Sequence, residues 1–195
     1  MKKGSYIPTI LRSPKTVFTF KDIVLLWGDS GNRVRVRLNY YIKKGDLIHI
    51  RRGFYAKDRG YDKLELATRI FTPSYISFET ILGEAGIIFQ YYNSIFSASY
   101  LTRNITINDQ RYSYRKIKDT TLTDKAGIDN RDQYSVASPE RAFLDTVYIN
   151  RDYHFDNLSS LSWDKVFKIL PIYKNKIMLK KVEKLYKHWR SDKKW

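Results

Sequence analysis

The sequence predicts an α+β protein with two domains. Turn-forming and capping residues divide positions 1–60 into short helices followed by a β-hairpin, and positions 95–117 contain β-rich runs joined by polar turns. Charge divides the chain similarly. Residues 1–60 carry 14 Lys and Arg against 4 Asp and Glu, residues 61–150 carry 10 against 11, and residues 151–195 carry 12 against 5. We therefore expect one domain over residues 1–60 and a second over residues 61–195, in which helices accompany a small antiparallel sheet.

Composition excludes several classes of protein. The chain contains no cysteine, which excludes disulfides, thiol catalysis and zinc sites with thiolate ligands, and its three histidines are isolated. We therefore expect no metal and no cofactor. The basic N-terminus lacks an apolar segment, and runs such as Ile23–Trp27 are too short to span a bilayer, so we expect a cytoplasmic protein without membrane contact. A formal net charge of +16 indicates an anionic partner.

The first domain begins with two short helices. Residues 6–12 form an amphipathic turn that Ser13-Pro14 ends. Thr19 is placed to cap a helix over residues 20–27, and Gly28 is placed to end it. The following residues, 29–32, have turn chemistry, and we expect Asn32 to cap the next element.

The next element, residues 33–44, is open to two interpretations. Alternation over residues 33–38 is typical of a strand, but it stops at Asn39. On a helical wheel, Val34, Leu38, Tyr41 and Ile42 share one stripe, and Arg33, Arg37, Tyr40 and Lys44 share the opposite one. We favour the helix, which Gly45 would end.

A β-hairpin is predicted next, over residues 47–56, with Arg51 and Arg52 at its tip. In the second domain we expect helices and strands in alternating groups. The helices expected are 61–71, 77–86 with Ser77 as cap, 138–150 with Ser138 as cap and Pro139 in its first turn, 162–170 ended by Pro171, and 174–190. The strands expected are 95–98, 103–107 and 111–117, with a turn at 108–110.

The order of two helices and a hairpin in residues 20–56 predicts a winged helix-turn-helix that binds duplex DNA. A helix fits the major groove, and a hairpin can lie along the backbone or the minor groove beside it. Val36 and Asn39 would flank the outward face, and Arg37→Ala would weaken binding by about 1–3 kcal/mol. The predicted DNA-binding residues are Arg33, Arg37, Asn39, Tyr40, Lys43, Lys44, Arg51 and Arg52. The alternative is a winged module that binds protein and has a solvated basic face.

No catalytic residues are predicted. Glu140 and Asp145 could be an acid–base pair, but they lie on different faces of a helix, and we expect Arg141 to form a buried network that fixes this helix against the sheet. A nuclease-related subunit remains an alternative, although no nuclease-like carboxylate pattern is present. An RNA-binding module is another, with stacking on Tyr91, Tyr92, Tyr112 and Tyr114. The C-terminal lysines either contact phosphate or form a solvated face.

Three segments, in order along the chain, resemble the AbiE-type antitoxins of type IV toxin–antitoxin systems. The run LIHIRRGFY at residues 47–55, preceded by Lys44-Gly45, is similar to the wing of that family. The run YISFETIL at residues 75–82 is similar to its YISLESAL stretch, and ASPERAFLD at residues 137–145 resembles its SPER…LLD helix. The resemblance spans residues 45–145.

This resemblance implies a bacterial, two-domain antitoxin. Proteins of this family repress their own operon through the winged helix, and the C-terminal domain counters a partner toxin of nucleotidyltransferase type, which need not be bound directly. The implied partners are therefore the chain's own operator DNA and such a toxin. The helix at residues 33–44 is richer in arginine than is usual in the family, so the resemblance implies no particular operator sequence.

Overall fold

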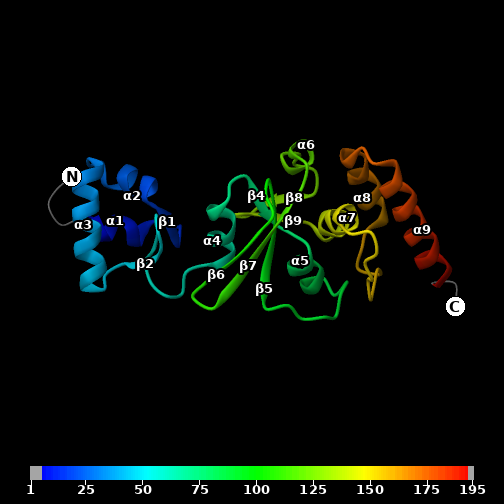
Figure 1. Cartoon of the computed structure of the whole chain (residues 1–195), viewed down its shortest axis with the longest axis horizontal. Helices are drawn as coiled ribbons and strands as arrows, with labels where there is room; N and C mark the ends of the chain where they lie inside the picture. Colours follow the sequence, from blue (N-terminus) through cyan, green and yellow to red (C-terminus); the bar gives the residue numbers. More distant parts are fainter. Residues whose placement is uncertain (1–5, 193–195) are drawn as a thin grey trace. The chain divides into compact units, whose positions relative to one another are not determined.

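The computed structural model describes residues 6–192, and the chain forms two compact units, Met1–Leu66 and Ala67–Trp195 (Figure 1). The division falls inside helix α4 (Lys63–Ile70). The fold is α+β, with nine α-helices, a three-stranded sheet and a six-stranded sheet within the described residues. None of the helices in residues 6–192 is long and apolar enough to cross a membrane.

The helices expected in the first unit are confirmed. They are α1 (Tyr6–Arg12), α2 (Phe20–Trp27) and α3 (Gly31–Lys44). Thr19 and Asp22 form a reciprocal capping box at the start of α2, and Gly28 ends this helix in the left-handed conformation. Asn32 is not the cap of α3, contrary to the prediction, because the helix begins one residue before it and Ser30 occupies the capping position.

The expected hairpin is also confirmed, and it belongs to a larger sheet. Strands β2 (Ile48–Arg51) and β3 (Phe54–Ala56) pair antiparallel, and β1 (Val17–Thr19) pairs with the other side of β3. The sequence did not predict β1, because three residues directly before a helix cap are too few to show alternation. The buried Glu65 carboxylate holds the start of β1, since it accepts hydrogen bonds from the Thr16 hydroxyl (2.6 Å) and the Val17 amide (3.2 Å).

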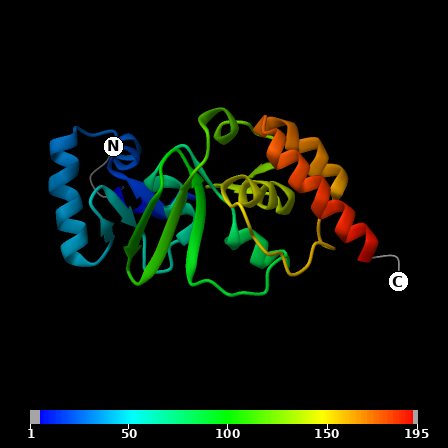
Figure 2. The ribbon, with the colours of Figure 1, turned by 45° about the vertical axis from the view of Figure 1, so that its right-hand side comes forward.

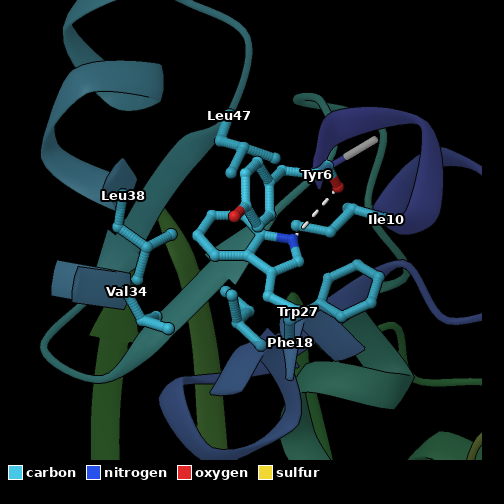
Figure 3. Packing of buried hydrophobic residues seen from close by; sticks show 8 residues of the cluster. Tyr6, Ile10, Phe18, Trp27, Val34, Leu38 and Leu47 are labelled. Atoms are coloured by element: carbon cyan, nitrogen blue, oxygen red, sulfur yellow. Dashed lines mark hydrogen bonds between the residues drawn. The ribbon is translucent and has the colours of Figure 1, made fainter. Parts of the chain in front are cut away.

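The core of the first unit lies between its helices and is centred on Trp27 (Figure 3). The Trp27 indole N–H donates to the Tyr6 carbonyl at 3.0 Å, and the two rings meet edge to face with centroids 5.3 Å apart. The remaining buried members of this cluster are Ile10, Phe18, Ile23, Val34, Leu38 and Leu47. Because Val34 and Leu38 are among them, one side of α3 is fixed against the core.

The second unit contains a mixed sheet that is larger than expected. Its strands are β4 (Ser74–Ile76), β5 (Ser94–Ser99), β6 (Arg103–Ile107), β7 (Gln110–Lys116), β8 (Ile128–Asn130) and β9 (Ser135–Ala137). Their order is β6-β7-β5-β4-β9-β8, with β5–β7 and β4–β9 parallel. The prediction of a small antiparallel sheet was therefore wrong. The β6–β7 hairpin and its turn were predicted correctly, and Asn108 and Asp109 have the positive φ angles of a tight turn.

The helices of the second unit pack beside the sheet and on one another (Figures 1 and 2). They are α5 (Glu79–Glu84), α6 (Asp119–Leu122), α7 (Pro139–Ile149), α8 (Trp163–Ile169) and α9 (Lys176–Asp192), with a 3₁₀ turn at Leu170–Tyr173. Ser138 caps α7 as expected, because its hydroxyl accepts from the Arg141 amide at 3.2 Å. Ser77 does not cap α5, since its hydroxyl donates to the Asp145 carboxylate instead (2.8 Å) and α5 starts after Phe78.

Candidate nucleic-acid interface

Helix α3 carries most of the residues predicted to contact DNA. Its inner stripe consists of the buried Val34 and Leu38, together with Tyr41 and Ile42, which are partly buried against the same core. Gly45 has a φ of 84° and donates its amide to the Ile42 carbonyl, which ends the helix before the hairpin. The stripe that was predicted to face the core is therefore confirmed, and it determines which residues of α3 face outward.

The outermost residues of α3 are Val36, Asn39, Tyr40 and Lys43. Val36 is 72% exposed and Tyr40 is 60% exposed, and Asn39 and Lys43 are exposed as well. At 100° per residue these positions lie opposite the buried stripe, so they form the crest of the helix. Three of the four are among the predicted residues. Val36 was assigned to the flank, and the structure places it at the crest.

Arg33 and Arg37 lie on the side of α3 that faces Asp29. The Arg33 guanidinium is 3.6 Å from the Asp29 carboxylate, and the Arg37 guanidinium is paired with the same carboxylate. The Arg37 guanidinium also lies over the Tyr6 ring, 4.2 Å from its centroid, and its side chain is only 32% exposed. Arg37 is therefore committed to contacts within the unit, whereas the Arg33 side chain is 74% exposed.

The other flanks of the helix carry further cations. Lys44 is exposed and lies 3.1 Å from the Asp46 carboxylate, and this hydrogen bond raises the pKa of Lys44. Arg35, which is not among the predicted residues, has its guanidinium 5.4 Å from the centroid of the Phe20 ring and is exposed. Arg35 falls on neither of the two helical-wheel stripes that were considered. Measuring the angle of every α3 residue from the core stripe would have identified it.

The hairpin presents the last two predicted residues. Arg51 ends β2 and is half-buried, and Arg52 is exposed in the turn. Gly53 has a φ of 83°, which residues other than glycine rarely adopt. Its carbonyl accepts a hydrogen bond from the Phe20 amide at 3.1 Å. The turn is thus fixed to the first residue of α2. All eight predicted residues lie in the first unit, on two adjacent segments joined by residues 45–47.

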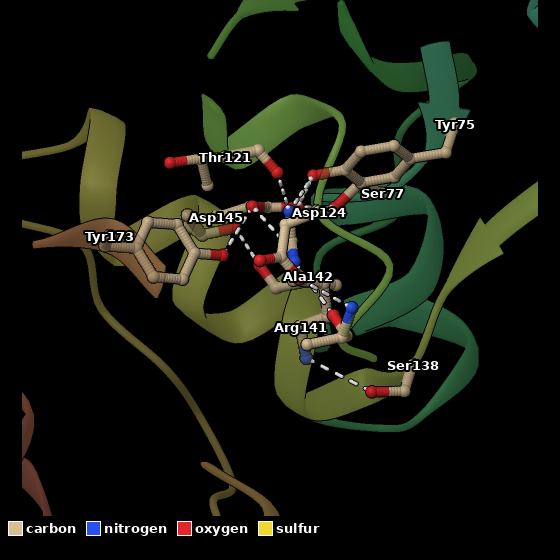
Figure 4. A network of polar contacts seen from close by, with 11 residues as sticks. Tyr75, Ser77, Thr121, Asp124, Ser138, Arg141, Ala142, Asp145 and Tyr173 are labelled. Carbon is tan, nitrogen blue, oxygen red and sulfur yellow. Dashed lines mark hydrogen bonds and ion pairs between the residues drawn. The ribbon is translucent and has the colours of Figure 1, made fainter. Parts of the chain in front are cut away.

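Asp145, one member of the possible acid–base pair in α7, belongs to a buried structural network (Figure 4). Arg141 and Asp145 are fully buried, and the Arg141 Nε lies 3.3 Å from the Asp145 carboxylate. The Arg141 guanidinium also donates to the carbonyls of Ala126 (2.8 Å) and Thr121 (2.6 Å). Glu140 is separate, since it accepts from the Ser162 amide at 3.2 Å. This is the network that was expected to fix α7 against the sheet.

Two buried tyrosines complete the network. The Asp145 carboxylate accepts hydrogen bonds from the hydroxyls of Tyr75 (3.0 Å) and Tyr173 (2.6 Å). Burial and the neighbouring carboxylate raise the pKa of both phenols well above the ordinary value, so both remain protonated donors. The side chains of Arg141, Asp145 and both tyrosines are buried. Within residues 6–192, no group of three or more His, Asp or Glu side chains is arranged to hold a metal ion.

The tyrosine platform proposed for RNA is not formed as predicted. Tyr112 and Tyr114 are fully buried, and the Tyr114 hydroxyl donates to the Ala67 carbonyl at 2.8 Å. Tyr91 and Tyr92 are exposed, in the loop before β5. Tyr112 and Tyr114 alternate with polar residues along β7, and their face is turned toward the protein interior.

Neither a protein-family model nor a curated protein matches the chain.

Proposed function

We propose that the unit Met1–Leu66 is a winged helix-turn-helix module that binds duplex DNA, with α3 in the major groove and the β2–β3 hairpin as the wing. The observation that carries this proposal is the surface of α3. Its 14 residues include five Lys and Arg and no Asp or Glu, and its buried stripe turns Val36, Asn39, Tyr40 and Lys43 outward. A cationic helix fixed to a small core suits the major groove in width and in charge.

The residues on the crest of α3 have chemistry that can read base edges. The Asn39 amide can bond bidentately to adenine, and the Val36 methyls can contact the methyl group of thymine. Lys43 can bond to guanine or to phosphate, and Arg33 can leave its weak contact with Asp29 for a phosphate. In the wing, Arg51 and Arg52 would contact phosphate or a narrow minor groove. Phosphate contacts would supply affinity, and the crest would supply specificity.

We further propose that the protein represses its own operon as the antitoxin of a type IV toxin–antitoxin system. This proposal is supported by the three segments that resemble AbiE-type antitoxins, at residues 44–55, 75–82 and 137–145. The functional partner would be a toxin of nucleotidyltransferase type. Direct contact between the two proteins is not required, so the test must measure rescue rather than complex formation.

The first experiment measures binding of the purified chain to a labelled duplex of its own upstream region and to a scrambled duplex, across a salt series. We expect tighter binding to the upstream duplex, by about a thousandfold or more. The logarithm of the binding constant should fall with the logarithm of salt concentration, with a slope of about −0.9 for each phosphate contact. A steep slope with no preference for the upstream duplex would contradict the repressor proposal.

Two variants and a control locate the interface. Asn39→Ala should weaken binding to the upstream duplex by about 1–3 kcal/mol and change binding to scrambled DNA little. Lys43→Ala should weaken binding to both duplexes and reduce the salt slope by about 1 if it contacts phosphate. Arg59→Ala is the control, because Arg59 is exposed but lies outside α3 and the hairpin. Equal effects of Lys43→Ala and Arg59→Ala would indicate diffuse charge attraction and no defined interface.

The antitoxin proposal is tested by expressing the nucleotidyltransferase-type toxin gene of the same operon with and without this chain. We expect growth arrest with the toxin alone and recovery when the full chain is present. The Asn39→Ala variant should relieve repression of the operon and still rescue growth, because the resemblance assigns rescue to the second domain. Continued arrest in the presence of well-expressed protein would overturn the antitoxin role and leave the DNA-binding proposal intact.

A further inference from the structure

One face of the sheet in the second unit carries an open polar groove beside exposed aromatic rings. We propose that this face binds single-stranded nucleic acid, at a site distinct from the duplex-binding surface proposed for α3. The inference is independent of the duplex proposal, since every residue that carries it lies between positions 87 and 157.

Strand register brings the groove residues to one face. Paired residues of adjacent strands point to the same side, and β7 pairs Arg111 with Ser94 of β5 and Ser113 with Phe96. On its other side, β7 pairs Arg111 with Thr106 of β6 and Ser113 with Asn104. These six residues line a groove of about 390 Å³. Its walls offer hydroxyl, amide and guanidinium groups, which are the groups that bond to base edges and to sugar hydroxyls.

Exposed aromatic rings lie in the loop that leads into β5, whose first residue, Ser94, lines the groove. In the loop before β5, Tyr91 is 85% exposed and Phe89 is 73% exposed. The adjacent Tyr92 ring meets the Phe96 ring edge-on, with centroids 5.6 Å apart, and Phe96 lines the groove. Nucleobases stack on exposed aromatic rings in proteins that bind single strands.

The aromatic loop is fixed by hydrogen bonds at its base. The Phe89 amide donates to the Asp156 carboxylate at 2.8 Å. The Ile87 carbonyl accepts from the amides of Asp156 (3.0 Å) and Asn157 (3.1 Å). The rings are therefore presented by an anchored backbone, which reduces the conformational entropy lost when a base stacks on them.

Charge around the groove suits an anion. Residues 103–116 contain four Lys and Arg and one Asp, within a region (61–150) whose Lys and Arg number 10 against 11 Asp and Glu. Arg111 is exposed in the groove and can contact phosphate. Arg115 has a different role, because it bonds to the buried Glu79 carboxylate (2.9 Å) between the rings of Phe78 and Phe96. We therefore expect stacking to dominate and phosphate contacts to be few.

These features also correct the platform predicted from sequence. On β7, Tyr112 and Tyr114 alternate with Arg111 and Ser113, so the tyrosines face the interior and the polar residues face the groove. Of the four tyrosines considered, only Tyr91 and Tyr92 lie where a base can reach them.

The test measures anisotropy of labelled oligonucleotides of about 12 nucleotides, within the range that one single-strand site covers. Three forms of one sequence are compared on the full-length protein: single-stranded RNA, single-stranded DNA and duplex DNA. An excess of unlabelled duplex is added to the single-strand arms, so that the basic surface of the first unit is occupied. The variant is Tyr91→Ala, and the matched control is Tyr100→Ala, which removes an exposed tyrosine that packs on Phe71 outside the groove.

We expect Tyr91→Ala to weaken single-strand binding by about five- to a hundredfold, and Tyr100→Ala to leave it unchanged. Duplex binding should be unchanged in both variants, and single-strand binding should show a shallow salt slope. A preference for RNA or for DNA would identify which single strand is the ligand. Equal single-strand binding by the parent and Tyr91→Ala, or complete displacement of the single strand by duplex, would overturn the proposal. The effect of Asn39→Ala on duplex binding tests the proposal for α3 and does not test the single-strand proposal.

Discussion

Replacement of Asp145 by Asn should destabilise the second unit strongly, because this carboxylate is a shared acceptor for four donors. One oxygen accepts from the hydroxyls of Ser77 (2.8 Å) and Tyr75 (3.0 Å), and the other accepts from the Tyr173 hydroxyl (2.6 Å) and the Arg141 Nε (3.3 Å). An amide group replaces one of these oxygens by a donor. Whichever way the amide is turned, two of the four donors then face its NH2 group, which cannot accept a hydrogen bond.

The expected magnitude follows from these contacts. An unsatisfied buried donor costs about 1–3 kcal/mol, and hydroxyl groups can rotate, so the two hydroxyl contacts fall at the low end. The larger cost comes from Arg141, which is fully buried and loses its counter-charge. Breaking a buried ion pair by removing one partner costs about 3–5 kcal/mol. Since whole domains are stable by about 5–15 kcal/mol, Asp145→Asn should remove a large part of the stability of this unit.

The assay is guanidinium unfolding followed by circular dichroism and tryptophan fluorescence, with Asp129→Asn as control because Asp129 is exposed on strand β8. The control should change the free energy of unfolding by less than about 0.5 kcal/mol. A loss of less than about 1 kcal/mol in Asp145→Asn would refute the view that this pair holds α7 in place.

Three further predictions concern backbone strain, acid stability and the flank of α3. Gly127→Ala should lower the free energy of unfolding by about 3 kcal/mol, because the φ angle of Gly127 is 70° and the new Cβ would lie 2.7 Å from Ile169 Cδ1. Gly86→Ala is the control, with a φ of 65° but open space around the new Cβ, and it should cost about 1 kcal/mol in thermal or denaturant unfolding. Burial alone would raise the pKa of Asp22, but hydrogen bonds from Lys15 and Thr19 outweigh it and leave the pKa below its ordinary 3.8. The cap should therefore stabilise the fold by about 1 kcal/mol above pH 3.8 and lose this contribution as pH falls through the lowered pKa, so the melting temperatures of the parent and Asp22→Asn should converge in acid. Arg37→Ala should lower the melting temperature through loss of its contacts with Asp29 and Tyr6, and should weaken operator binding less than Lys43→Ala does; the opposite order would show that Arg37 reaches the DNA.

The helices of this protein could be predicted because their ends are determined locally. Thr19 and Gly28 bound α2, and Ser138 and Pro139 begin α7, each through contacts within a few residues. Helix α3 was ambiguous only at its start, where arginines alternate with valines. The stripe of Val34, Leu38, Tyr41 and Ile42 distinguished the helix from the strand, because it requires a period near 3.6 over about two turns.

The sheet of the second unit could not be predicted in the same way, because its pairing is non-local. Strands β4, β8 and β9 have three residues each, which is too short for alternation to be visible. The strand that follows β5 along the chain is β6, but β7 lies between them and pairs with β5 in parallel. Only the β6–β7 hairpin had a local signal, in its polar turn.

The crest of α3 shows where reasoning from residue type is insufficient. Polarity suggested that Arg37 faces solvent and that Val36 lies beside it, whereas the structure gives Val36 the greater exposure. An arginine side chain is long enough to turn back to a nearby carboxylate, here Asp29, and a helical wheel contains no information about the turn before the helix. The angle between a residue and the buried stripe on the helical wheel predicts exposure better than polarity does, because this angle depends only on which residues form the core.

This placement has a consequence for how α3 could combine affinity with specificity. The contact between Arg33 and Asp29 is long, and the Arg33 side chain is largely exposed, so the pair contributes little to stability and a phosphate can replace the carboxylate. Arg37 is held by the same carboxylate and by the Tyr6 ring, and it stays with the protein. On DNA binding, Arg33 would leave Asp29 for a phosphate of the DNA backbone, and Arg37 would remain paired with Asp29. On the crest, the short, neutral side chains of Val36 and Asn39 would lie beside Tyr40 and Lys43, and the buried stripe would set their position over the base edges.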